Sequence, residues 1–231
     1  MRFNSDQIQK IGKEISSKVD GKTLFDEFSR GRYSTDASVY QIKPLGVVLP
    51  KDTNDVLSLM EYSQKNSVPL LARGGGSSQC GQTVGESVVL DYSKHQNKIL
   101  ELNVEEKYVW VQPGVVLDHL NAYLKPHGLW FPVDVSTSSR ATIGGMSANN
   151  SCGSRSLYYG NMVHNVLAIE AILDDGSIFN FDQINKNYLA TKNNQDRLYK
   201  IIDKFIDVRQ QVGGEIDANW PTTQRRVGGY N

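Results

Sequence analysis

Cysteine is almost absent from this 231-residue chain, which contains only Cys80 and Cys152. Two cysteines supply neither a disulfide framework nor a metal-binding set, so we expect each to be a small buried residue and no metal to be bound. Long apolar runs are also missing, since the longest candidate, VLAIEAIL, is interrupted by Glu170. The polar N-terminus lacks the apolar centre of a signal peptide. We therefore expect a cytoplasmic protein without a transmembrane segment, or one peripheral at the inner face of a membrane.

An excess of charge of either sign is missing as well. The chain has 25 basic and 25 acidic residues and a formal net charge of zero. Without a basic field we expect no nucleic-acid partner, and without an acidic run we expect no disordered acidic tail. The 39% share of hydrophobic residues is ordinary for a globular core. The length suits one large domain or two small subdomains.

What the chain does have is glycine in two clusters, of which the first spans Leu70–Gly85. An apolar run ends at Arg73 and is followed by three glycines, two serines and Gln79. Glycine permits positive φ and close backbone approach, and successive N–H groups in such a turn form a concavity that binds anions. The stretch is not a P-loop, because Gln82 stands where the lysine belongs, nor a dinucleotide fingerprint, because Gln79 replaces the last glycine. It predicts a phosphate cradle of another type, with a flexible surface loop as the alternative.

The first half of the chain predicts a small parallel layer. Helices are expected within residues 1–28, where isoleucines recur at helical spacing, and a plain connecting loop over 29–41. Buried strands are expected within 44–50, 69–71 and 87–90, with a helix capped by Asp52 and Thr53 after the first of them. Strand, helix and strand, with the glycine cluster after the second strand, indicate a βαβ unit.

The second half has antiparallel patterns. Residues 100–111 alternate as two strands, 116–124 form an amphipathic helix, and 166–173 and 177–181 flank Asp174-Asp175-Gly176, which favours a hairpin turn. A last helix is expected around residues 198–205. The fold class is therefore α+β.

The second cluster, residues 131–160, is dense in Gly, Ser, Thr and Asn. A structureless loop of this length is uncommon in a compact domain unless it binds something, although a solvated connection is the alternative. Its hydroxyl, amide and main-chain groups suit a large polar ligand. Two such clusters on separate sublayers indicate an extended phosphate-bearing ligand between them.

The motifs, in their order along the chain, carry a family resemblance. They are Arg73–Ser78, Gly81-Gln82, Gln112–Gly114, Phe131–Asp134, Ala141–Gly145, Asn149-Asn150, Tyr159-Gly160 and Asp175-Gly176. The chain resembles the FAD-binding domain of the vanillyl-alcohol oxidase and p-cresol methylhydroxylase (PCMH-type) flavoproteins, and within them the glycolate oxidase and D-lactate dehydrogenase group. RYSTDASVYQIKPLGVVLP is also similar to large bacterial members that fuse this domain to an iron–sulfur module.

The resemblance implies a fold, a domain order and a set of cofactor contacts. The fold would be a PCMH-type α+β fold with a parallel βαβ subdomain (31–97) and an antiparallel subdomain with helices (98–231), preceded by a helical segment (1–30). Main-chain groups around the glycine loop would wrap the FAD pyrophosphate, and the later residues would line the flavin, its ribityl chain and the adenine. The implied FAD-binding residues are Arg73, Gly74, Gly75, Gly76, Ser77, Ser78, Gln79, Gln82, Pro132, Asp134, Ser136, Thr137, Ala141, Thr142, Gly144, Gly145, Asn149, Asn150, Ser151, Gly153 and Ile169.

The resemblance also implies how FAD is attached and what is missing. Relatives that link the flavin covalently have histidine where this chain has Ser77, or cysteine where it has Arg140, so noncovalent FAD is expected. His164 departs from the family pattern, and we interpret it as a structural histidine. The chain ends where the family passes into a substrate-binding cap domain, so it looks like an N-terminal fragment, for which we name no catalytic acid or base.

The implied activity is oxidation of a 2-hydroxy acid such as D-lactate or glycolate by hydride transfer to FAD. The electrons would pass to an iron–sulfur or quinone acceptor, and the fragment alone would be inactive. Two alternatives remain: the same fold with another substrate, as in an alditol oxidase or a sugar-nucleotide reductase, and a nucleotide-binding module without catalysis.

Overall fold

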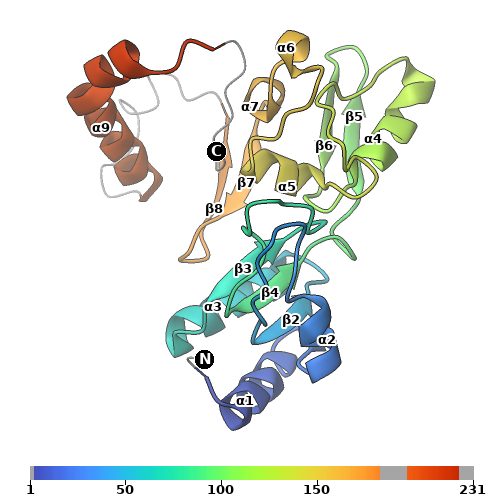
Figure 1. Cartoon of the computed structure of the whole chain (residues 1–231), viewed down its shortest axis with the longest axis vertical. Helices are drawn as coiled ribbons and strands as arrows, with labels where there is room; N and C mark the ends of the chain where they lie inside the picture. The colour runs from blue at the N-terminus through green and yellow to red at the C-terminus, as the bar shows by residue number, and fades with distance from the viewer. Residues whose placement is uncertain (1–2, 183–196, 224–231) are drawn as a thin grey trace. The chain divides into compact units, whose positions relative to one another are not determined.

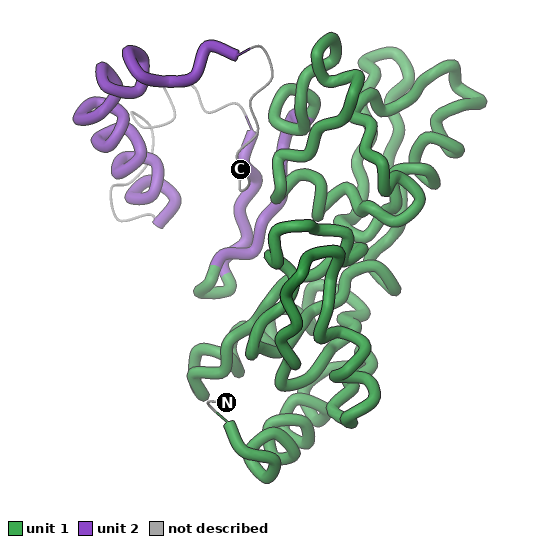
Figure 2. The backbone as a smooth tube through the Cα atoms, in the orientation of Figure 1, with its two compact units in different colours: residues 1–165, 174–176, 227–231 green, residues 166–173, 177–226 purple. Residues whose placement is uncertain are grey.

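A computed structural model describes residues 3–182 and 197–223 of the chain (Figure 1). The chain divides into two compact units, which Figure 2 distinguishes by colour. Unit 1 comprises residues 1–165, 174–176 and 227–231, and unit 2 comprises residues 166–173 and 177–226.

The N-terminal region contains the expected helices and one unexpected strand. Helix α1 (Ser5–Ser16) begins with a capping box between Asn4 and Gln7 and buries its isoleucines, and α2 (Glu27–Arg32) follows an Asp26 cap. Strand β1 (Lys22–Leu24) lies between them. Its three residues are too few to give a period, so residues 1–28 were wrongly expected to hold helices alone.

A four-stranded sheet forms the core of this part of unit 1. Its order is β1-β2-β4-β3, with β2 (Gly46–Leu49), β3 (Leu70–Arg73) and β4 (Val88–Asp91), and the latter three appear side by side in Figure 1. Pairings of β4 with β2 and β3 are parallel, whereas β1 runs antiparallel to β2. Helix α3 (Thr53–Asn66) connects β2 to β3 and is capped by Asp52. The parallel layer is confirmed, with β4 inserted between the two strands of the βαβ unit.

The antiparallel part of unit 1 follows. Strands β5 (Ile99–Asn103) and β6 (Tyr108–Val111) pair with a register shift near Ile99. Helix α4 (Leu117–Leu124) buries its apolar face with Val115, and a short 3-10 helix η1 (Lys125–His127) ends at Gly128. Both the strand pair and the helix agree with the sequence pattern.

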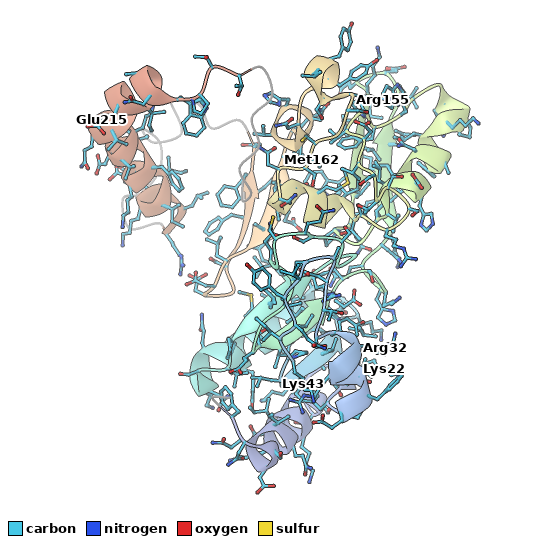
Figure 3. All side chains as sticks on the ribbon, in the orientation of Figure 1. Lys22, Arg32, Lys43, Arg155, Met162 and Glu215 are labelled. Atoms are coloured by element: carbon cyan, nitrogen blue, oxygen red, sulfur yellow. The ribbon has the colours of Figure 1, made fainter. Side chains whose placement is uncertain are left out.

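Residues 131–160 are not the unbroken loop that their composition suggests. Two short helices, α5 (Ile143–Ala148) and α6 (Ser156–Tyr159), interrupt them, and α7 (Met162–Asn165) follows. Their Gly- and Ser-rich sequences have low helix propensity, so tertiary packing has to stabilise them. Met146 of α5 and Met162 of α7, the latter labelled in Figure 3, are both buried.

Unit 2 contains the two strands of the predicted hairpin and the last helix. Strands β7 (Ile169–Ile172) and β8 (Ile178–Phe181) are antiparallel and flank the Asp174-Asp175-Gly176 turn, in which Gly176 has a φ of 81°. Helix α9 spans Arg197–Asn219. Across the described residues, we find no helix with the length and apolarity that crossing a bilayer requires.

Candidate functional site

The glycine loop, residues 74–85, follows β3 and reaches the turn that precedes α5 (Figure 1). A Cβ on Gly74 would lie 2.0 Å from the Thr142 Oγ1, and one on Gly75 would lie 2.2 Å from the Arg140 carbonyl oxygen. Gly76 has a φ of 64°, in the left-handed region that L side chains rarely adopt. The first two glycines are therefore required by packing against the second glycine cluster, and the third by backbone conformation.

This packing leaves the main-chain donors of the loop unused. In the part of the chain that the structure describes, no backbone N–H from Gly74 to Gln79 donates a hydrogen bond to another protein group. All six residues are exposed or half-buried. Consecutive donors of this kind form a concavity suited to an anion such as a phosphate. Ser78 adds a hydroxyl that accepts a hydrogen bond from the Cys80 N–H at 3.2 Å.

Arg73 has its guanidinium directed into the protein. Nη2 donates to the Thr35 carbonyl at 2.9 Å, and Nη1 donates to the carbonyls of Thr83 at 3.1 Å and Tyr33 at 3.4 Å. The guanidinium also lies 5.2 Å from the centre of the Tyr33 ring. Burial lowers the pKa of Arg73, and nearby Asp91 counteracts this. The side chain therefore ties the start of the loop to its end and to the segment around Tyr33.

Gln82 joins the two glycine clusters. Its Nε2 donates to the Asn149 Oδ1 at 2.9 Å, and the Asn149 Nδ2 donates to the Ser151 hydroxyl at 3.1 Å. The Gln82 Oε1 is buried and accepts no hydrogen bond from the described residues. Because an unpaired buried acceptor is unfavourable, a donor from a bound molecule is expected there.

Main-chain hydrogen bonds fix the start of α5. The Ala141 carbonyl accepts from the Leu117 N–H at 3.0 Å, and the Gly144 N–H donates to the Pro113 carbonyl at 2.9 Å. Thr142 is 2% exposed and caps α5 by accepting from the Gly145 N–H at 3.3 Å. Of the predicted residues here, Ala141, Thr142 and Gly144 serve the packing of this turn.

Asp134 organises the loop after α5. Its Oδ2 accepts from the Ser154 hydroxyl at 2.7 Å, and its Oδ1 accepts from the Arg155 N–H at 3.0 Å. A Cβ on Gly153 would lie 1.9 Å from the Asp134 carbonyl oxygen, which explains the glycine. Burial raises the pKa of Asp134, but the hydrogen bonds from Ser154 and Arg155 outweigh this, so the pKa lies below its usual value.

The remaining predicted residues occupy different surroundings. Pro132 is half-buried and Ser136 is exposed, while the Thr137 carbonyl accepts from the Arg140 N–H at 2.8 Å. Asn150 has a φ of 47° and accepts from the Val163 N–H at 3.1 Å. Ile169 lies on β7 in unit 2, so its contact with adenine stays a prediction, as do the FAD contacts of the other residues.

His164 contacts the residues just before it in the chain, and its interpretation as a structural histidine stays a prediction. Its Nδ1 accepts a hydrogen bond from the Asn161 N–H at 3.0 Å, and its ring packs where a side chain on Gly160 would stand. Cys80 is exposed and Cys152 half-buried, so the expectation that both are buried is wrong. The described residues contain no cluster of His, Cys, Asp and Glu that suits a metal ion.

The contacts of the segment Tyr33–Gln41 with the glycine loop were missed, because its residue pattern predicted a plain connection even though its sequence carries part of the family resemblance. Thr35 binds Arg73, and the Asp36 carboxylate accepts from the Thr83 hydroxyl at 3.1 Å. The segment has no hydrophobic period. Its local features are turns made by short polar side chains: Asp36 accepts from the Ser38 N–H at 2.8 Å, and the Ser38 hydroxyl accepts from the Tyr40 N–H at 3.1 Å.

Comparison with known proteins gives a family and several relatives. A family described as "FAD binding domain" matches residues 44–182. D-2-hydroxyglutarate dehydrogenase of Escherichia coli is 37% identical over 91% of this chain and 21% of its own length. The Bacillus subtilis glycolate oxidase subunit GlcD is 37% identical over 74% of this chain and 37% of its own, and the mitochondrial D-lactate dehydrogenase [cytochrome] of Kluyveromyces lactis is 40% identical over 59% and 24%.

Solved structures agree on the fold. Alkyldihydroxyacetonephosphate synthase superposes with a TM-score of 0.65 at 20% identity, over 78% of this chain and 35% of that one. The 6-hydroxy-D-nicotine oxidase of Arthrobacter nicotinovorans gives 0.64 at 16% identity, over 74% and 38%. The chain spans only 15% to 22% of the length of the D-2-hydroxyglutarate dehydrogenases that it matches. The family resemblance of the sequence is confirmed: this chain belongs to the PCMH-type family of FAD-binding domains, and its cofactor is FAD.

Proposed function

We propose that this chain binds FAD noncovalently as the cofactor domain of an enzyme that oxidises a 2-hydroxy acid. The observation that carries the proposal is the glycine loop itself. Six consecutive residues, Gly74–Gln79, offer main-chain N–H groups that no described protein group accepts, within the region that matches the FAD family.

The residues present fit FAD. The loop donors suit the two phosphates of the pyrophosphate, which carry negative charge and accept several hydrogen bonds. The buried Gln82 Oε1 needs a donor, and FAD has both hydroxyl and N–H groups. The wall formed by Pro132–Thr137 and Ala141–Gly153 would hold the flavin and the ribityl chain. When bound, FAD supplies the hydride acceptor, while the protein supplies orientation and electrostatics.

Noncovalent attachment is part of the proposal. Ser77 and Arg140 occupy the positions where the covalently linked relatives have histidine and cysteine, and neither side chain can form such a link. The Arg140 carbonyl is also packed against Gly75. FAD would therefore be held by hydrogen bonds and packing alone.

The substrate class comes from the relatives. Those that share 37% to 40% identity are named for D-2-hydroxyglutarate, glycolate and D-lactate, each of which is a 2-hydroxy acid. Since the chain spans about a fifth of the longest relatives, we propose that the substrate-binding cap lies in another part of the whole protein. We also propose that the electrons pass from FAD to an iron–sulfur or a quinone acceptor. No side chain described here is assigned as a catalytic acid or base.

The visible spectrum of the purified protein, before and after FAD addition and desalting, tests the proposal. A retained flavin band that acid denaturation releases into the supernatant is the expected result. The variant Gly76→Ala, whose Cβ would lie 2.4 Å from the Arg73 guanidinium at a φ of 64°, should retain little flavin. Gly85→Ala is the matched control, because its nearest contacts are at 3.6 Å. A whole protein without flavin after reconstitution would overturn the proposal, and flavin that stays with the denatured chain would overturn noncovalent attachment.

A further inference from the structure

The segment Tyr33–Gln41 lies against the glycine loop although it precedes the part of the chain that matches the FAD family, residues 44–182. The Thr35 carbonyl accepts from Arg73, and the Asp36 carboxylate accepts from the Thr83 hydroxyl. A Cβ on Gly81 would lie 2.5 Å from the Tyr40 ring. The segment therefore contacts the loop at its start and at two positions near its end.

The Arg73 guanidinium lies inside this arrangement. It donates to the carbonyls of Tyr33, Thr35 and Thr83 and stacks on the Tyr33 ring, and the left-handed turn at Gly76 passes directly over it. Because Thr83 is near the end of the loop, one guanidinium closes the loop onto its own start. Its planar set of donors suits several carbonyls at fixed directions, which an ammonium cannot reproduce.

Tyr33 is in turn held by the sheet. Its hydroxyl donates to the Asp91 Oδ2 at 2.6 Å, and Asp91 is the last residue of β4, 4% exposed. The other Asp91 oxygen accepts from the Ser93 N–H at 2.8 Å. A continuous set of contacts thus leads from the end of β4, an inner strand of the sheet, through Tyr33 to Arg73.

We propose that Arg73 and the segment Tyr33–Gln41 form a template that holds the glycine loop in its FAD-binding conformation before the cofactor arrives. In this arrangement the Arg73 charge is used by protein carbonyls and does not contact the pyrophosphate. The inference rests on the proposed FAD function. Its physical basis is preorganisation: a glycine-rich loop released from the template would have to be ordered at the moment of binding, which lowers affinity.

Two variants of Arg73 distinguish a template from a direct phosphate contact. Arg73→Ala and Arg73→Lys should both weaken FAD binding about tenfold or more, as measured by calorimetric titration. Lysine keeps the positive charge but lacks the planar set of N–H donors that binds the three carbonyls. The phosphorus NMR resonances of bound FAD should shift in both. If Arg73→Lys restores wild-type affinity, the charge acts directly on the pyrophosphate and the template is refuted.

A matched pair of tyrosines separates positioning from stability. Tyr33→Phe and Tyr62→Phe each remove one phenol-to-carboxylate hydrogen bond, of 2.6 Å to Asp91 and 2.7 Å to Glu14 respectively. Only Tyr33→Phe should weaken binding of FAD, about threefold to tenfold, and binding of ADP, which retains the pyrophosphate, by a similar factor. Thr83→Val should act in the same direction, since it removes the hydroxyl that binds Asp36.

Binding of FAD and ADP to the wild type and to the variants distinguishes a failure of the template from a failure of the proposed function. A wild-type protein that binds neither FAD nor ADP would overturn the proposed function, and the template with it. A wild-type protein that binds FAD, together with unchanged dissociation constants in Tyr33→Phe and Thr83→Val, would overturn the template alone. Equal effects of Tyr33→Phe and Tyr62→Phe on FAD binding would also overturn it, because the effect would then be one of general stability.

Discussion

The variant Gly75→Ala tests whether this glycine is required by the protein or by its ligand. The added Cβ would lie 2.2 Å from the Arg140 carbonyl oxygen, whereas real contacts of this kind lie above 3.0 Å. The two loops would therefore have to separate by about 1 Å. Overpacking changes cost about 1–3 kcal/mol, and because a backbone carbonyl cannot rotate away, we expect a loss near 3 kcal/mol. At about 2–4 °C per kcal/mol, the thermal midpoint should fall by roughly 6–12 °C.

Calorimetry without added FAD, with Gly85→Ala as the control, measures this loss. Equal midpoints for the two variants would refute the reasoning, because a glycine needed only for ligand approach has no effect on the protein alone. Gly74→Ala adds a second check. Its Cβ would meet the Thr142 Oγ1 at 2.0 Å but the Thr142 Cβ only at 3.2 Å, so adding Thr142→Ala should recover part of the lost stability. No side-chain substitution at Arg140 should rescue Gly75→Ala.

Three further results are expected. Asp55 accepts from three backbone N–H groups that hold β1 beside β2, so Asp55→Ala should lower the free energy of unfolding in urea by about 3 kcal/mol; a loss below about 1 kcal/mol would contradict this. The pKa of Asp134 is lowered in the folded state, so its ionised carboxylate stabilises that state at pH values above the ordinary pKa of 3.8. This contribution is lost as the pH falls below 3.8. The stability of Asp134→Asn should therefore decline less between pH 5 and pH 3 than that of the wild type. Burial raises the pKa of Tyr92 from 10.0 to about 12, so this phenol alone should lower the unfolding free energy by up to about 1.4 kcal/mol per pH unit between these pH values. Because the pKa values of Tyr33 and Tyr62 are raised too, Tyr92→Phe should make the measured decline shallower by that amount without abolishing it.

The elements that sequence reasoning predicted correctly are those with a local pattern. Ile8, Ile11 and Ile15 recur at helical spacing and are buried in α1. The antiparallel pairing of β5 with β6 and the Asp-Asp-Gly turn between β7 and β8 are equally local and appear in the structure. The strict alternation expected along β5 does not, because the register shift near Ile99 leaves Leu100 53% exposed. Such patterns predict an element correctly because they depend on the spacing of residues within that element and not on distant partners.

The features that were missed depend on distant residues. Strand β1 is three residues long and is held by Asp55, whose carboxylate accepts from the Gly21 N–H 34 positions away. The contacts of Tyr33 with Arg73 and Asp91, and of Asp36 with Thr83, cross 40 to 58 residues of sequence and involve polar groups without a period. Helices α5 and α6 were missed because Gly- and Ser-rich segments predict loops unless their tertiary partners are known.

The glycine loop shows why its sequence alone does not define a phosphate site. Gly74 and Gly75 hold the loop to residues 140–142 through close contact, and Arg73 holds its ends through side-chain donors. Neither set of contacts uses a main-chain N–H group of Gly74–Gln79, so these donors stay available for a ligand. A run of three glycines without the turn at Arg140 and the Tyr33–Gln41 segment would have the same donors but no fixed conformation. If the template that we propose is correct, the affinity for an anion depends on residues that do not touch it, and variants of those residues are the sharper test of the site.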